Sequence, residues 1–112
     1  MGNRKELTEK LLPIMDTMYL LSGRWKIVIM TTLYLGGKMR FNGIKRNIPK
    51  ITGRTLSKDL KFLEENDIVE RTVKDTSPIT VEYELTDYGK TLDSVFKALT
   101  EWGKNHRKRI IG

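Results

Sequence analysis

The sequence predicts a mainly α-helical domain that carries one small β-hairpin. Three observations support this fold class. Apolar residues recur at helical spacing in several segments, they alternate with polar residues in two short segments near the middle of the chain, and a proline-containing turn separates those two segments. The length of 112 residues suits a single core, and no repeat or long linker divides the chain. We therefore expect residues 1–112 to form one domain.

The N-terminal third predicts a surface segment followed by a buried helix. Residues 1–12 are expected to form a polar arm that ends at Pro13, because proline suits the first turn of a helix. The later segment RWKIVIMTTLYL has apolar residues almost all the way round the helix axis. We expect this helix to be buried, with Trp25 in the core, and to end at Gly36 and Gly37.

Residues 41–66 predict two helices joined by a short turn. The segment FNGIKRNI forms two helical turns and ends before Pro49, because the residue before a proline avoids the helical conformation. Thr52 is a plausible N-cap for a following helix that extends to about Asn66. This arrangement is typical of a helix-turn-helix unit. The inner face of the second helix is expected to carry Leu56, Leu60 and Leu63.

Residues 68–86 predict a hairpin, and residues 87–110 predict a long amphipathic helix. The segments IVERTVKD and TVEYELT alternate apolar and polar residues around the turn TSPI. A continuous apolar stripe runs along the last helix. A helix-turn-helix followed by a hairpin and a closing helix is a winged helix-turn-helix, an α+β fold.

Charge is segregated along this sequence, which has a net charge of +7. Between residues 41 and 62, six lysines and arginines accompany a single acidic residue, Asp59. Residues 63–86 are predominantly acidic, and residues 104–109 form a second basic cluster. Such segregation favours a polyanionic partner, with nucleic acid as the first candidate.

Other function classes find little support in the sequence. The absence of cysteine excludes disulfides and thiolate metal sites, and the single histidine, His106, has no acidic partner nearby. Gly36 and Gly37 form a turn rather than a phosphate loop. No apolar run is long enough to span a membrane, and no signal peptide precedes the domain. We therefore expect a cytoplasmic protein with no catalytic residues, no metal, no cofactor and no membrane contact.

Three segments resemble the HxlR-type winged-helix transcriptional regulators, which are relatives of the MarR group. These segments are LSGRWKIVIM, MRFNGIKRNIPKITGRTLSKDLKFLEENDIVERTV and VEYELTDYGKTL. The resemblance extends over residues 13–104. It implies a homodimer that binds a palindromic operator in double-stranded DNA and usually represses transcription.

The sequence departs from the family pattern at two positions. Leu12 stands where many members have a cysteine that senses oxidants, so thiol sensing is excluded for this chain. Thr80 stands where the wing of many members has an arginine. We therefore expect no strong arginine contact from the wing to the minor groove.

The outward face of the second helix of the helix-turn-helix supplies the candidates for reading bases. The N-terminal turns of a recognition helix enter the major groove, where arginine suits guanine and hydroxyl groups suit several bases. The preceding helix lies across the backbone, and only the tip of the acidic hairpin is expected to approach the DNA. The base-contact candidates are Arg54, Thr55, Ser57 and Lys58; the phosphate candidates are Lys45, Arg46, Lys50, Thr52, Lys61 and Lys74.

Dimerisation is expected because one small winged helix covers too little DNA for selective binding. The candidates for the dimer interface are Met15, Phe96, Leu99 and Trp102, although the same side chains could instead pack within one chain.

Two further interpretations stay open. Met15, Met18 and Met30 could line a cavity for an unidentified small-molecule effector, or they could be ordinary core residues. The winged helix could also serve protein interaction or RNA binding. The basic outward face argues against protein interaction, and the sequence shows no aromatic stacking surface for single-stranded RNA.

Overall fold

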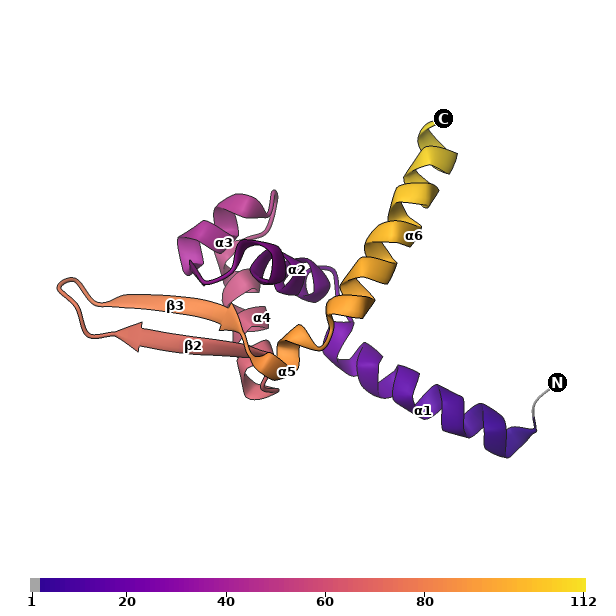
Figure 1. Ribbon diagram of the computed structural model, residues 1–112. Coiled ribbons are helices and arrows are strands. Elements are labelled where there is room, and N and C mark those ends of the chain that lie inside the picture. Colours follow the sequence, from indigo (N-terminus) through magenta and orange to yellow (C-terminus); the bar gives the residue numbers. More distant parts are fainter. Residues whose placement is uncertain (1–2) are drawn as a thin grey trace.

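A computed structural model describes residues 3–112 of the chain. A central body combines three helices with a small antiparallel sheet, and the first and last helices project from it in different directions, away from the hairpin (Figure 1). The strand order in the sheet is β1-β3-β2. This is the winged helix-turn-helix that the sequence predicts. The elements in order are α1 (Arg4–Leu21), α2 (Lys26–Gly36), β1 (Met39–Arg40), α3 (Phe41–Asn47), α4 (Gly53–Glu65), β2 (Val69–Lys74), β3 (Thr80–Leu85), α5 (Asp87–Lys90) and α6 (Asp93–Ile111).

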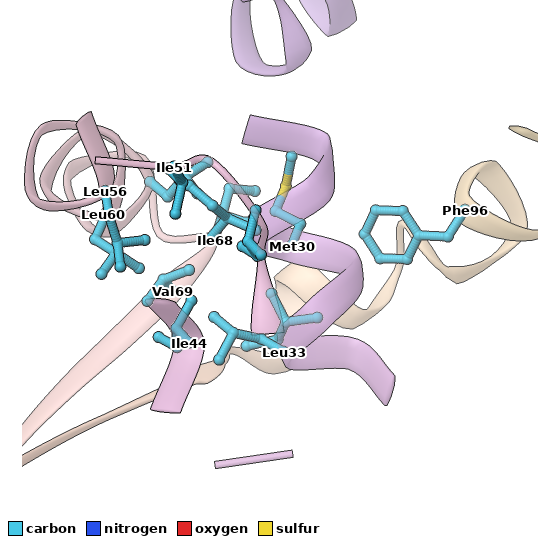
Figure 2. Packing of buried hydrophobic residues seen from close by; sticks show 13 residues of the cluster. Met30, Leu33, Ile44, Ile51, Leu56, Leu60, Ile68, Val69 and Phe96 are labelled. Atoms are coloured by element: carbon cyan, nitrogen blue, oxygen red, sulfur yellow. The ribbon is translucent and has the colours of Figure 1, made fainter. Parts of the chain in front are cut away.

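The hydrophobic core lies between α2, α3, α4 and the sheet. The inner face of α4 is fully buried there, as its leucine spacing predicts. Figure 2 shows Phe96 of α6 reaching α2 from the side opposite the other labelled residues. The buried residues are Ile29, Met30, Leu33, Ile44, Ile48, Ile51, Leu56, Leu60, Leu63, Ile68, Val69, Leu85 and Phe96.

The predicted polar arm is wrong from Arg4 onward, because this part of the chain is helical. The side chain of Asn3 caps α1 by accepting a hydrogen bond from the backbone N–H of Glu6 at 2.8 Å. Pro13, expected at the helix start, lies inside the helix. Asparagine followed three residues later by glutamate is an N-terminal capping signal, and it is stronger than the proline signal on which the prediction rested. Residues 1–2 lie outside the described part of the chain.

Helix α2 is less buried than predicted. Ile29, Met30 and Leu33 are buried, but Leu35 is 78% exposed and Val28 is 37% exposed. Trp25 packs against the core, as predicted, and is half-buried. One face of α2 is therefore exposed in the single chain.

The wing is the hairpin of β2 and β3, and it forms around the predicted turn. Val69 pairs with Leu85 and Val73 with Val81, so these apolar side chains share one face of the hairpin. The short strand β1 was not predicted. It pairs with β3 through two residues and places Arg40 opposite Glu82.

The predicted continuous helix over residues 87–110 is wrong at residues 91–92, where the chain turns between α5 and α6. The cause is the tight packing of α5 on the body. Any side chain at Gly89 would overlap the carbonyl oxygen of Ile68, and the Thr86 hydroxyl accepts a hydrogen bond from the Gly89 N–H at 2.9 Å. After this turn, α6 begins beside α2 and then projects away from the body (Figure 1).

Candidate nucleic-acid interface

The outward face of α4 carries the predicted base-contact residues. Arg54, Ser57 and Lys58 are all exposed, while the opposite face of the helix is anchored by buried leucines. Lys61 is exposed on the same outward side, one turn further along. The rigid inner packing therefore holds these polar side chains at one surface of the domain.

The N-terminus of α4 is closed by Thr52, as predicted. Its hydroxyl accepts a hydrogen bond from the Thr55 N–H at 3.1 Å and donates one to the Thr55 hydroxyl at 3.0 Å. Thr55 is half-buried, so of the predicted base contacts it is the one whose side chain is already engaged within the chain. The remaining free N–H groups of the first turn give this helix end a partial positive charge.

The preceding helix and the turn place further cations beside α4. Lys45 and Arg46 are exposed in the last turn of α3. Lys50, in the turn itself, has a φ angle of 71°, a left-handed conformation that glycine or asparagine adopts at lower cost. A lysine at this position lowers the stability of the fold relative to glycine, but it adds a positive charge beside α4.

None of the six cations between residues 41 and 62 forms an ion pair within 4 Å in the part of the chain that the structure describes. The face formed by α3, the turn and α4 thus keeps its positive charge uncompensated. This is the electrostatic arrangement expected of a surface that binds nucleic-acid phosphates.

The cations of the sheet are arranged differently. Lys74 Nζ lies 3.0 Å from Glu82 Oε1, and Lys38 Nζ lies 3.7 Å from Glu84 Oε1. The close contact with Lys74, aided by the charges of Lys38 and Arg40, holds the pKa of Glu82 below its ordinary value despite partial desolvation. Glu82 is therefore ionised at neutral pH. The phosphate contact predicted for Lys74 rested on its charge, and that charge is paired within the chain.

The candidates for the dimer interface divide into two groups. Met15, Leu99 and Trp102 are 63%, 51% and 69% exposed. Phe96 is only 3% exposed and packs against Tyr34, with ring centroids 5.4 Å apart. The burial of Phe96 matches the alternative in which this side chain packs within one chain, because the turn before α6 directs it into the body.

The three methionines do not gather at one place in the chain. Met30 is fully buried, whereas Met18 is 51% exposed on α1 together with Met15. No group of three or more metal-ligating side chains occurs among residues 3–112. No helix in that part of the chain is long and apolar enough to cross a membrane.

Two charged residues of the interface region were missed by sequence reasoning. Arg40 lies in β1, which is too short to show an alternating pattern. The importance of Glu82 comes from its position opposite Arg40 in the sheet and from its contact with Lys74. Composition reveals neither of these.

Fold and surface together define a winged helix-turn-helix protein with an exposed basic recognition helix, the architecture of DNA-binding transcriptional regulators. The profile of the HxlR-like helix-turn-helix family matches residues 20–110, and the chain belongs to this family. An HTH-type transcriptional regulator of Bacillus subtilis (strain 168), YtcD, is 38% identical over 96 residues, which cover 86% of this chain and 75% of YtcD. A regulator of Methanothermobacter thermautotrophicus is 44% identical over 84 residues, which cover 75% of this chain and 63% of that protein.

Solved structures show the same fold. The redox regulator HypR in its reduced form has a TM-score of 0.81 and 37% identity, covering 88% of this chain and 96% of that chain. The reduced form of YodB from B. subtilis has a TM-score of 0.72 and 35% identity, covering 91% of each chain. In this sequence, which contains no cysteine, thiol chemistry is unavailable as a signal.

Proposed function

We propose that this protein is a homodimeric regulator that represses transcription by binding a palindromic operator. The observation that carries the proposal is the uncompensated basic face of α3, the turn and α4. Its exposed Arg54, Ser57 and Lys58 are suited to base edges, and Lys45, Arg46, Lys50, Thr52 and Lys61 are suited to phosphates. The resemblance to HxlR-type regulators supplies the expected sign of regulation.

The terminal helices support a dimer. Helix α1 is 18 residues long and has no buried residue, although most helical stability in proteins comes from packing of an apolar face. Burial of the exposed apolar side chains of α1, α2 and α6 between two copies would remove a large apolar surface from water. These side chains are Leu7, Leu11, Leu12, Ile14, Met15, Met18, Tyr19, Val28, Leu35, Leu99, Trp102, Ile110 and Ile111.

Gly103 supports a close contact between chains. It lies inside α6, and a Cβ built on it would meet nothing within 4 Å, so no contact within the described chain explains a glycine there. Glycine in a helix interior costs about 0.5–1 kcal/mol relative to alanine. Because exposed Leu99 and Trp102 flank it, we propose that a helix of the second copy crosses α6 at this point.

Selection from a random pool of DNA duplexes tests operator binding. The recovered duplex and a scrambled duplex are then titrated at two salt concentrations. A recovered palindrome that binds at least about a thousandfold more tightly than the scrambled duplex supports the proposal and gives the half-site spacing. Equal affinities that both fall steeply with salt would mean that the basic face binds only the backbone. Absence of DNA binding would favour the protein-interaction alternative, and tighter binding to RNA would favour the RNA alternative.

Sedimentation over a range of concentrations tests the dimer. Gly103→Ala should strengthen the isolated helix yet raise the dimer dissociation constant, because a methyl group would separate the two helices. Glu101→Ala, on the side of α6 away from Leu99 and Gly103, is the control and should leave dimerisation unchanged. A monomeric wild-type protein would refute the homodimer, whereas a dimer unaffected by Gly103→Ala would refute only the crossing point.

A further inference from the structure

The end of α1 contacts the recognition helix through an aromatic pair. The ring of Tyr19 lies 5.5 Å from that of Phe62 on α4, at an interplanar angle of 57°. This is the tilted geometry that aromatic pairs favour. Tyr19 is 64% exposed, so it contributes little to the core, whereas Phe62 is half-buried beside it.

The beginning of α2 contacts the same phenylalanine. Lys26 Nζ lies 4.4 Å from the centroid of the Phe62 ring and donates a hydrogen bond of 3.3 Å to the carbonyl oxygen of Ser22. Ser22 ends α1, and its N–H donates to the carbonyl oxygen of Met18 at 2.8 Å. The charge over the ring and the aromatic pair thus attach the α1–α2 junction to one side chain of α4.

Phe62 occupies a position from which it can orient the outward face of α4. This face carries Arg54, Ser57 and Lys58 and is called the reading face. Phe62 lies four residues after Lys58, so the two side chains are separated by only about 40° around the helix axis. Leu60 and Leu63 fix the inner side of the same helical turn in the core. A shift of the junction against Phe62 would therefore change the angle between α1 and the reading face, rather than the structure of α4.

We propose that Tyr19, Phe62 and Lys26 are positioning residues that set the spacing between the two half-sites of the operator. The inference rests on the proposed homodimer, in which α1 belongs to the contact between copies. In a two-fold dimer, the angle between α1 and α4 in each chain determines the separation of the two recognition helices. One added base pair moves a half-site by about 3.4 Å and about 35°, so a firm junction selects one spacing.

Parallel selections from the random duplex pool test this inference, using the wild-type protein, Tyr19→Ala and the control Tyr19→Phe, which keeps the ring. The wild type and Tyr19→Phe should each recover one spacing. Tyr19→Ala should recover the same half-site with mixed spacings. Its preference for the wild-type spacing over spacings changed by one base pair should fall about two- to tenfold, the range that aromatic pairs contribute. Phe62→Leu, which keeps an apolar side chain without the ring, should give the same result.

Two further readouts separate positioning from folding and from dimerisation. Titration of a single half-site and the dimer dissociation constant should both be unchanged in Phe62→Leu, because Phe62 lies on α4, outside the proposed contact between copies. A single, unaltered spacing in Tyr19→Ala and Phe62→Leu would overturn the inference, as would loss of half-site binding. Recovery of no palindrome by the wild type would instead refute the proposed function.

Discussion

The recognition helix and the wing both carry lysines, but those of the recognition helix form no ion pair in the described chain, whereas Lys74 of the wing is paired with Glu82. On α4 and the turn before it, Arg54, Lys58 and Lys50 have no ion-pair partner within 4 Å among residues 3–112. On the sheet, Lys74 and Lys38 are held by carboxylates of the central strand β3. Composition already distinguishes the basic helix-turn-helix from the acidic hairpin, but only the register of the sheet shows which carboxylate lies beside Lys74.

The difference indicates where the affinity for DNA originates. A free cation beside a phosphate releases a condensed counterion from the DNA, whereas a cation that must first leave a carboxylate gains less. We therefore expect α3, the turn and α4 to supply the charge-dependent affinity, and the wing to add little. Substitutions that remove these unpaired cations, or that release Lys74 from its partner, therefore test this difference.

Lys58→Ala or Arg54→Ala should have the largest effect. If the residue reads a base, its loss should cost about 1–3 kcal/mol and relax specificity at one operator position. Titration of the recovered operator and its single-base variants measures both quantities. Lys61→Ala, further along the same face, is the control for a phosphate contact and should weaken all sequences equally. A uniform loss for Lys58→Ala would reclassify that residue as a phosphate contact.

Lys45→Ala should weaken binding to every sequence alike. The plot of log affinity against log salt should become shallower by about one unit, because one phosphate contact is lost. Lys97→Ala, an exposed lysine on α6, removes the same charge away from the helix-turn-helix. An equal change for both variants would show that net charge, rather than a contact made by α3, determines the slope.

Lys50→Gly should separate stability from binding. Relief of the left-handed backbone at φ 71° should raise the free energy of unfolding by up to about 1 kcal/mol, while loss of the cation should make the salt slope shallower. Denaturant unfolding and DNA titration of the same variant measure the two effects. A stabilised protein with unchanged DNA binding would remove Lys50 from the phosphate candidates.

Much of the fold could be predicted from the sequence, because its determinants are local. The leucine spacing of α4 and the cap at Thr52 define the recognition helix, and the alternating pattern defines the hairpin. The start of α1 also has a local determinant, because Asn3 and Glu6 form a capping signal ahead of Pro13. These features depend on residues a few positions apart.

Features that depend on distant contacts could not be predicted. The turn before α6 depends on Gly89 meeting Ile68, and it places Phe96 in the core rather than at the surface. The pairing of Lys74 depends on the register that brings Glu82 beside it. The exposed cations of the candidate site were identifiable from helical geometry, but their lack of partners became visible only in three dimensions.

Glu82→Gln should give the wing an uncompensated positive charge like that of the recognition helix. The substitution keeps the shape of the side chain but leaves Lys74 and Arg40 without their counter-charge. Affinity for all DNA sequences should rise, and the salt slope should become steeper by up to about one unit. Glu70→Gln is the control, since Glu70 has no ion pair within 4 Å in the described residues. Equal gains in both variants would attribute the effect to net charge alone.

Lys74→Ala should have the smallest effect and decides the role of the wing most directly. Because Lys74 lies 3.0 Å from Glu82, its removal should leave the salt slope of operator binding nearly unchanged. A decrease of about one unit would instead show that the lysine exchanges Glu82 for a phosphate when DNA binds. Combining Lys74→Ala with Glu82→Gln sharpens the test. If the affinity gained by Glu82→Gln comes from a released Lys74, the double variant should lose that gain, whereas a gain that persists would point to Arg40.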